Sequence, residues 1–171
     1  MWLGSWLLAC TAPEDTAVEQ DTAVELESYA CELGVPDADR NFTPLTEDTP
    51  LELVLGFQGF LFVELMVRTE VTPPEHSEAL MSLAADGRDP TGVSQPVTGF
   101  TTDAGTSTTE PLLLFLPDSD VGGWTGRYAD VAVKIVDAER ECLVLGAGYL
   151  VDEDPCLHTG GEPICYEDTG L

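Results

Sequence analysis

Apolar and polar residues alternate with a period of two through much of the chain, and the longest such stretch is Leu51–Thr69. Leu51, Leu53 and Leu55 share one parity, and apolar residues share one parity again over Leu61–Val67. This alternation predicts β-strands that are buried on one face and partly covered on the other. The glycines between the two runs would each weaken a helix by about 1 kcal/mol, and they suit a turn. We therefore predict two core strands joined by a hairpin.

Other segments have the composition of shorter strands. Glu75–Ala85 fits a short helix as well as a strand, and the strands predicted on either side favour the strand. The continuous apolar run Pro111–Leu116 predicts a strand that is buried on both faces. Pro36–Pro50, Arg88–Glu110 and Pro117–Gly126 are rich in turn-forming residues and are predicted to be mainly loops. The remaining predicted strands are Ser28–Val35, Pro96–Thr101, Tyr128–Val136 and Cys142–Val151.

Six to eight short strands with Gly- and Pro-rich turns between residues 28 and 151 predict an all-β fold. We expect a two-sheet antiparallel sandwich of immunoglobulin-like type, although a jelly roll or a small barrel fits the strand count as well. A membrane span is disfavoured, because it needs about 20 apolar residues and Glu52 and Glu64 interrupt the central run.

The charge of the chain restricts its partners. Its 171 residues include 32 acidic and 6 basic side chains, which gives a formal net charge of −26. Nucleic acid is excluded as a partner class, because its recognition depends on lysine and arginine at the phosphates. The acidic surface predicts solubility and mutual repulsion between copies. Weak, distributed binding of divalent cations is the alternative consequence.

The N-terminal segment has the features of an export signal. Met1–Ala9 is apolar, and Cys10 follows it directly. The sequence Leu7-Leu8-Ala9-Cys10 resembles the lipobox of bacterial lipoproteins. This resemblance implies that Met1–Ala9 is a signal peptide, that Cys10 carries the lipid, and that the protein is anchored in the cell envelope, at the outer membrane or the cell surface. Because no Lys or Arg precedes the apolar run, a cytosolic protein with a buried N-terminus is the alternative.

The segment after Cys10 predicts a tether. Residues 11–27 contain the repeat DTAVEQ/DTAVEL and several acidic side chains but no basic one. Such a composition cannot bury enough apolar surface to fold, so we expect a disordered, self-repelling spacer. The predicted organisation is a signal peptide (1–9), the lipidated cysteine and tether (10–27), the β-sandwich domain (28–151) and an acidic, disulfide-looped tail (152–171).

A second resemblance concerns the domain itself. Cys31–Gly34, Phe42–Leu45 and Leu51–Phe60, followed by a strand that ends in Arg68, resemble segments of a group of uncharacterised exported bacterial lipoproteins. These proteins couple an acidic Thr/Asp-rich tether to a predicted immunoglobulin-like β-sandwich. The resemblance implies the fold and the location, and it carries no activity.

The cysteines other than Cys10 are even in number, which in an exported chain predicts two disulfides. They are Cys31, Cys142, Cys156 and Cys165. Three pairings are possible. We expect Cys31–Cys142, because the first strand of such a sandwich can lie beside the last, and Cys156–Cys165, because these two enclose a short Gly/Pro loop.

The spacing of potential ligands in the sequence suggests two candidate metal sites. Zinc could be held by Cys142, Cys156, Cys165 and His158, but the paired CxxC motifs typical of zinc sites are missing. Calcium could be held by Asp118 and Asp120, which alternate in a Gly-containing turn. This turn lacks the third acidic position and the distal Glu of an EF-hand, so an ordinary Asp-capped turn is the alternative.

Catalytic motifs are not evident in the sequence. It contains no GxSxG elbow, no supported Cys–His pair and no phosphate-binding glycine loop. Pairs of carboxylates carry little information in a chain this acidic. We expect a lipid-anchored, non-catalytic envelope or surface module without a cofactor, which binds a protein or glycan through its loops or a sheet face. The alternatives are a calcium-responsive surface protein that uses Asp118 and Asp120, and a carboxylate-based hydrolase.

Overall fold

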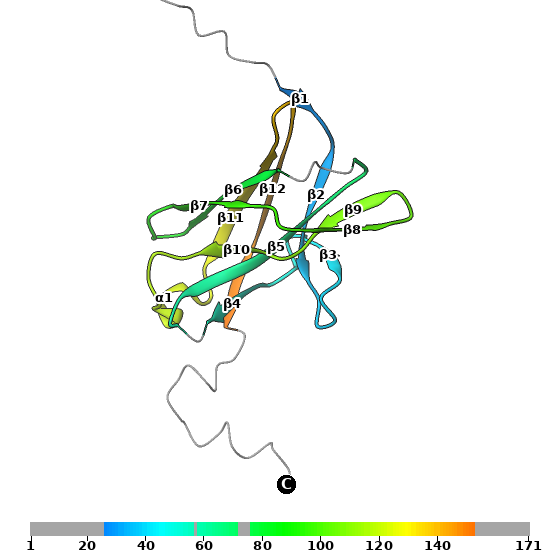
Figure 1. Ribbon diagram of the computed structural model, residues 1–171. Helices are drawn as coiled ribbons and strands as arrows, with labels where there is room; N and C mark the ends of the chain where they lie inside the picture. Colours follow the sequence, from blue (N-terminus) through cyan, green and yellow to red (C-terminus); the bar gives the residue numbers. More distant parts are fainter. Residues whose placement is uncertain (1–25, 57, 72–75, 153–171) are drawn as a thin grey trace, which may run out of the picture.

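The computed structural model describes residues 26–56, 58–71 and 76–152. Nearly all of the elements in these ranges are strands, which form one curled, mixed sheet with 12 strands (Figure 1). The predicted all-β fold is therefore confirmed. The bounds of the strands are β1 Glu27–Ser28, β2 Cys31–Pro36, β3 Phe42–Pro44, β4 Leu51–Leu55, β5 Leu61–Thr69, β6 Glu78–Ala85, β7 Thr91–Pro96, β8 Phe100–Asp103, β9 Thr106–Thr109, β10 Leu112–Phe115, β11 Tyr128–Val136 and β12 Arg140–Asp152.

The strands predicted from strict alternation form as expected. β4 and β5 pair antiparallel, with Leu55 opposite Leu61 across the hairpin. β11 has the predicted bounds, Tyr128–Val136. The ambiguous segment Glu75–Ala85 contains β6, which alternates strictly between exposed and buried residues. The preference for a strand there is confirmed.

Several strands were missed in segments without alternating large apolar residues. The predicted loop Pro36–Pro50 contains β3. Within Arg88–Glu110, where one short strand, Pro96–Thr101, was expected among loops, the structure has β7, β8 and β9, and the expected strand overlaps only the end of β7 and the start of β8. β9 shows why it was missed: its buried positions are Ser107 and Thr109. The Thr109 hydroxyl accepts a hydrogen bond from the backbone N–H of Val67, 3.0 Å away, so polar side chains replace apolar packing at this strand.

The sheet is mixed, whereas a purely antiparallel arrangement was expected. β12 pairs in parallel with β1 at its start and with β4 at its end. A continuous path of paired strands runs β3-β2-β5-β4-β12-β11-β6-β7, and β9 and β10 also pair with β5. The expected division into two sheets is not confirmed, because β4 links the strands around β5 to β12 and β11.

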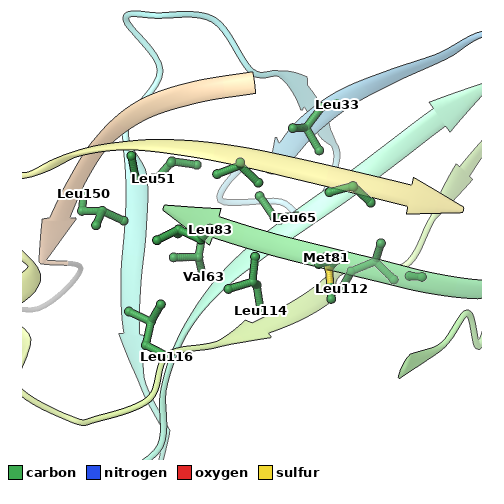
Figure 2. Close-up of a cluster of buried hydrophobic side chains, with 14 of the residues drawn as sticks. Leu33, Leu51, Val63, Leu65, Met81, Leu83, Leu112, Leu114, Leu116 and Leu150 are labelled. Carbon is green, nitrogen blue, oxygen red and sulfur yellow. The ribbon is translucent and has the colours of Figure 1, made fainter. Parts of the chain in front are cut away.

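The core lies inside the curl of the sheet, where inward side chains of β5 and β10 face those of β6 and β11 (Figure 2). Val131, Val133 and Ile135, which were predicted to point inward, are each 2% exposed or less. The short helix α1, Val121–Trp124, closes one end of this core with Val121 and Trp124. No helix in the described ranges is long and apolar enough to cross a membrane.

A disulfide joins Cys31 of β2 to Cys142 of β12, with their Cα atoms 6.1 Å apart. This is the pairing that the sequence predicted. The disulfide connects two strands that are not paired with each other in the sheet. β2 pairs with β5, and β12 pairs with β11. The second predicted disulfide, Cys156–Cys165, lies outside the described residues, as do Cys10 and most of the predicted tether and tail.

Candidate binding site

The outer face of β5 and β10, together with the turn before β5, carries aromatic side chains that take no part in the core. Phe62 on β5 lies opposite Phe115 on β10, and their rings meet edge to face with centroids 5.7 Å apart. Phe60 contacts the same Phe115 ring at a centroid distance of 6.1 Å. Phe60 is 58% exposed and Phe115 is 36% exposed. Clustered apolar side chains that remain exposed are typical of interaction sites.

These aromatic residues border a concave surface that we call the aromatic groove. Its volume is about 710 Å³, within the range of pockets that bind ligands. Polar side chains contribute little to its wall, since Gln58 is the one polar side chain among the lining residues. The lining residues are Gly56, Gln58, Phe60, Phe62, Leu113, Phe115, Leu116 and Pro117.

The sequence did not reveal this groove, because the run Pro111–Leu116 was interpreted as buried on both faces. In the structure Leu112, Leu114 and Leu116 are buried, whereas Leu113 and Phe115 point outward into the groove. A continuous apolar run cannot distinguish a covered outer face from an apolar outer face that stays open. The shared parity of Phe60 and Phe62, opposite to that of the core residues of β5, is the signal that could have found it.

A smaller, acidic cavity of about 220 Å³ adjoins the groove, and we call it the acidic pocket. Its carboxylates are Asp37, Glu52 and Glu64. Glu64 lies opposite Leu113 of the groove, and its Oε2 accepts a hydrogen bond from Arg40 Nη1 at 2.7 Å. Hydrogen bonds from Asn41, above all from its backbone N–H, hold the pKa of Asp37 below its usual range. The apolar part of the wall consists of Val35, Pro36, Pro50 and Val54.

A second apolar surface lies on the outer face of β11 and β12, and we call it the Leu143 face. Leu143, Leu145 and Tyr149 are 62%, 72% and 56% exposed. Tyr149 packs edge to face against Tyr128, with ring centroids 5.0 Å apart. The hollows next to Leu145 have volumes of about 250 and 410 Å³, smaller than the aromatic groove. The groove is thus the larger hollow of these two apolar surfaces.

The predicted calcium ligands Asp118 and Asp120 do come together, and the side chain between them is Arg88. Its Nη1 and Nη2 donate to Asp118 Oδ2 at 3.1 Å and to Asp120 Oδ2 at 3.0 Å. The other oxygens are also used: Asp118 Oδ1 accepts from Trp124 Nε1 at 2.8 Å, and Asp120 Oδ1 caps α1 through the N–H of Gly123. The calcium site stays a prediction, and the geometry here is that of the alternative, an Asp-capped turn.

Asp118 makes an acid-sensitive contribution to stability. The hydrogen bond from Trp124, followed by the N–H of Asp120 and the charge of Arg88, holds the pKa of Asp118 below its usual range. This stabilisation is therefore complete above the unfolded pKa of about 3.9 and is lost as the pH falls through the lower folded value. In urea unfolding, Asp118→Asn should be less stable than wild type at neutral pH, and the difference should shrink in acid. The exposed Asp89→Asn is the control, and an equal pH dependence in both variants would contradict this assignment.

Metal binding finds no further support in the described part of the chain. No group of three or more His, Cys, Asp or Glu side chains there is placed to hold a metal ion. The zinc alternative required Cys142 as a thiolate ligand, and Cys142 is joined to Cys31 instead. Its other ligands, Cys156, Cys165 and His158, lie outside the described residues.

All six basic residues of the chain lie in the described part, and each contacts the protein itself. Arg127 donates to the backbone carbonyl of Gly123, and the other five pair with carboxylates. These five residues form six ion pairs, which are Arg40–Glu64, Arg68–Glu32, Arg88–Asp118, Arg88–Asp120, Lys134–Glu141 and Arg140–Asp137. The cations of the molecule are thus engaged internally, and its surface is dominated by acidic groups.

The fold and the site define an acidic all-β domain with an open aromatic groove beside an acidic pocket. The chain matches no protein-family model, and no curated protein is significantly similar to it.

Proposed function

We propose that this protein is a lipid-anchored, non-catalytic module of the bacterial cell envelope that binds a protein or glycan partner through the aromatic groove. The observation that carries the proposal is the exposure of Phe60 and Phe115 in a concave, apolar site. Exposed aromatic side chains in a hollow provide a large contact area at a low entropic cost, and they are enriched in the central contacts of interfaces.

The position of the groove fits a domain that is tethered at its N-terminus. β1, next to the proposed tether, pairs with Arg140 and Glu141 at the start of β12. β4, which leads into the groove at Gly56, pairs with the last three residues of β12 (Figure 1). β12 has 13 residues, each of which adds about 3.3 Å along the strand. The place where β1 pairs and the place where β4 pairs are therefore roughly 40 Å apart. An anchor on Cys10 would therefore hold the groove at the end of the domain away from the membrane.

The net charge of −26 supports the same orientation. An anionic membrane surface repels an acidic domain, so a disordered acidic tether would keep the domain off the lipid. The groove would then remain accessible to a partner rather than being covered by lipid headgroups.

We also propose that the two halves of the curled sheet form an immunoglobulin-like sandwich. It is supported by the core, to which β5 and β10 contribute from one side and β6 and β11 from the other. It is also supported by the contact between the two halves at their rims, where Thr91 Oγ1 of β7 donates to the Phe115 carbonyl at 3.3 Å.

The proposal is tested by site-specific photocrosslinking in bacteria that express the full chain with its N-terminal segment. Phe60→p-benzoyl-phenylalanine places the probe in the groove, and Leu143→p-benzoyl-phenylalanine is the matched control on the Leu143 face. We expect an adduct from position 60 that is absent from position 143. Intact mass should show loss of Met1–Ala9 and added acyl mass on Cys10.

The variant Cys10→Ala separates the anchor from the groove. It should lose the acyl mass, leave the membrane fraction and lose the adduct from position 60. An unlipidated wild-type chain would overturn the anchor. A lipidated chain that forms no adduct at position 60, or forms the same adduct at both positions, would overturn the groove as the docking site.

A further inference from the structure

The aromatic groove and the acidic pocket lie next to each other on one face of the sheet, in a fixed register. Phe62 and Glu64 are successive outward residues of β5, which places them about 7 Å apart along the strand. On the neighbouring strand, Val54 lies opposite Phe62, and Glu52 is the next outward residue. On each of these two strands, an apolar side chain that faces outward is therefore two positions away from an outward carboxylate. The pairs are Phe62 and Glu64 on β5, and Val54 and Glu52 on β4.

The carboxylates of the acidic pocket differ in the hydrogen bonds and ion pairs that they already form within the protein. Asp37 accepts hydrogen bonds from Asn41 and Asp39 within its own turn. Glu64 is bonded to Arg40, whose side chain is 60% exposed. Glu52 is exposed, and its strand holds it at the pocket wall. A cation that enters the pocket would meet the Glu52 carboxylate and could share Glu64 with Arg40.

We propose that the groove and the acidic pocket together bind an extended, positively charged peptide segment of a partner protein. An aromatic or aliphatic side chain of the segment occupies the groove, and a lysine or arginine two residues away enters the acidic pocket. An extended segment repeats its side chains on one face about every 7 Å, which matches the spacing from Phe62 to Glu64. This inference rests on the proposed function and names its partner class.

Charge complementarity favours this occupant over two others. A second copy of the chain would bring two net charges of −26 together, which opposes association. The chain's own C-terminal residues 153–171 follow Asp152, which lies opposite Leu53, close to the groove. That segment contains acidic residues and no lysine or arginine. It therefore lacks the group that the acidic pocket would select.

The test is fluorescence anisotropy of the full chain with short labelled peptides in a Gly/Ser frame. One peptide carries Phe-Ser-Lys, its charge-reversed partner carries Phe-Ser-Glu, and a third carries Ala-Ser-Lys. We expect Phe-Ser-Lys to bind at least about tenfold more tightly than either of the other two, with an affinity that falls as salt screens the pocket.

Four variants locate the binding. Phe115→Ala should weaken Phe-Ser-Lys by about tenfold, the usual effect of truncating an aromatic side chain central to an interface. Glu52→Gln should weaken it and flatten its salt dependence. Arg40→Asn, which removes the competing cation at Glu64 and is compatible with the positive φ of residue 40, should strengthen it. Leu145→Ala, on the Leu143 face, should leave the affinity unchanged.

Other results would overturn the inference in distinct ways. Equal binding of Phe-Ser-Lys and Phe-Ser-Glu would assign the groove to apolar ligands without charge selection. Loss of binding in Leu145→Ala would move the docking site to the Leu143 face. Absence of binding by all peptides would reject a cationic peptide partner. If the lipid anchor and the adduct at position 60 were present in that case, the proposed function would stand and this partner class alone would fail.

Discussion

The variant Cys31→Ala/Cys142→Ala is expected to lose about 4 kcal/mol of unfolding free energy relative to the oxidised wild type. The disulfide closes a loop with a sequence separation of 111, which contains most of the strands of the sheet. In the chain-entropy account, the stabilisation arises because a long loop restricts the unfolded chain more than a short one. The measurement is urea unfolding of the full chain, followed by far-UV circular dichroism.

The matched controls are the two single variants and added reductant. Cys31→Ala and Cys142→Ala should each cost nearly as much as the pair, because either change opens the same loop, so the effects should not add. Reductant should destabilise the wild type by more than the double variant, in which only the predicted Cys156–Cys165 bond remains to be reduced. Two results would contradict this role of the disulfide. One is that the losses of the two single variants add up in the double variant, and the other is that the stability of the wild type does not change when its Cys31–Cys142 bond is reduced.

Elements that bury one face against the core were predictable from the sequence, because burial selects apolar side chains at every second position. β4, β5, β6 and β11 all follow this pattern. The Cys31–Cys142 pairing was also predictable, because it required only that the first and last predicted strands lie side by side. It did not depend on the parity or the register of either strand.

The parts that were missed are held by interactions that leave no periodic pattern. β3 is three residues long, and β9 is fixed by hydroxyl groups such as that of Thr109. The parallel pairing of β12 with β1 and β4 depends on how the sheet curls, which alternation along single strands does not specify. The mixed sheet therefore could not be distinguished from an antiparallel sandwich.

The candidate site was predictable only in part. Asp118 and Asp120 were singled out for their spacing, but the guanidinium between them comes from Arg88, about 30 positions earlier in the chain. The aromatic groove combines the β4–β5 turn with Phe115 on β10, so it exists only once β5 and β10 are paired. Acidic side chains near a turn are visible in a sequence, whereas the partner that neutralises them is not.

Trp124→Ala is expected to cost about 4 kcal/mol of unfolding free energy, a loss comparable with that of the disulfide. Trp124 is fully buried although it lies in the four-residue helix α1. Three separate contacts converge on it, because it packs into the core, donates to Asp118 and lies under the Arg88 guanidinium, 4.6 Å from the ring centre. Removing the ring leaves a cavity and also frees Asp118 and Arg88 to separate.

Trp124→Phe separates the apolar packing from the hydrogen bond. It keeps an aromatic ring in the core but removes the N–H donor to Asp118, so we expect a loss of about 1–2 kcal/mol. Both variants should be measured by urea unfolding with circular dichroism. Trp2, Trp6 and Trp124 are the tryptophans of the chain, so a wild type processed at Cys10 would report on Trp124 alone by fluorescence. Equal losses for Trp124→Phe and Trp124→Ala would show that the Asp118 hydrogen bond, rather than the buried ring, holds this end of the core together.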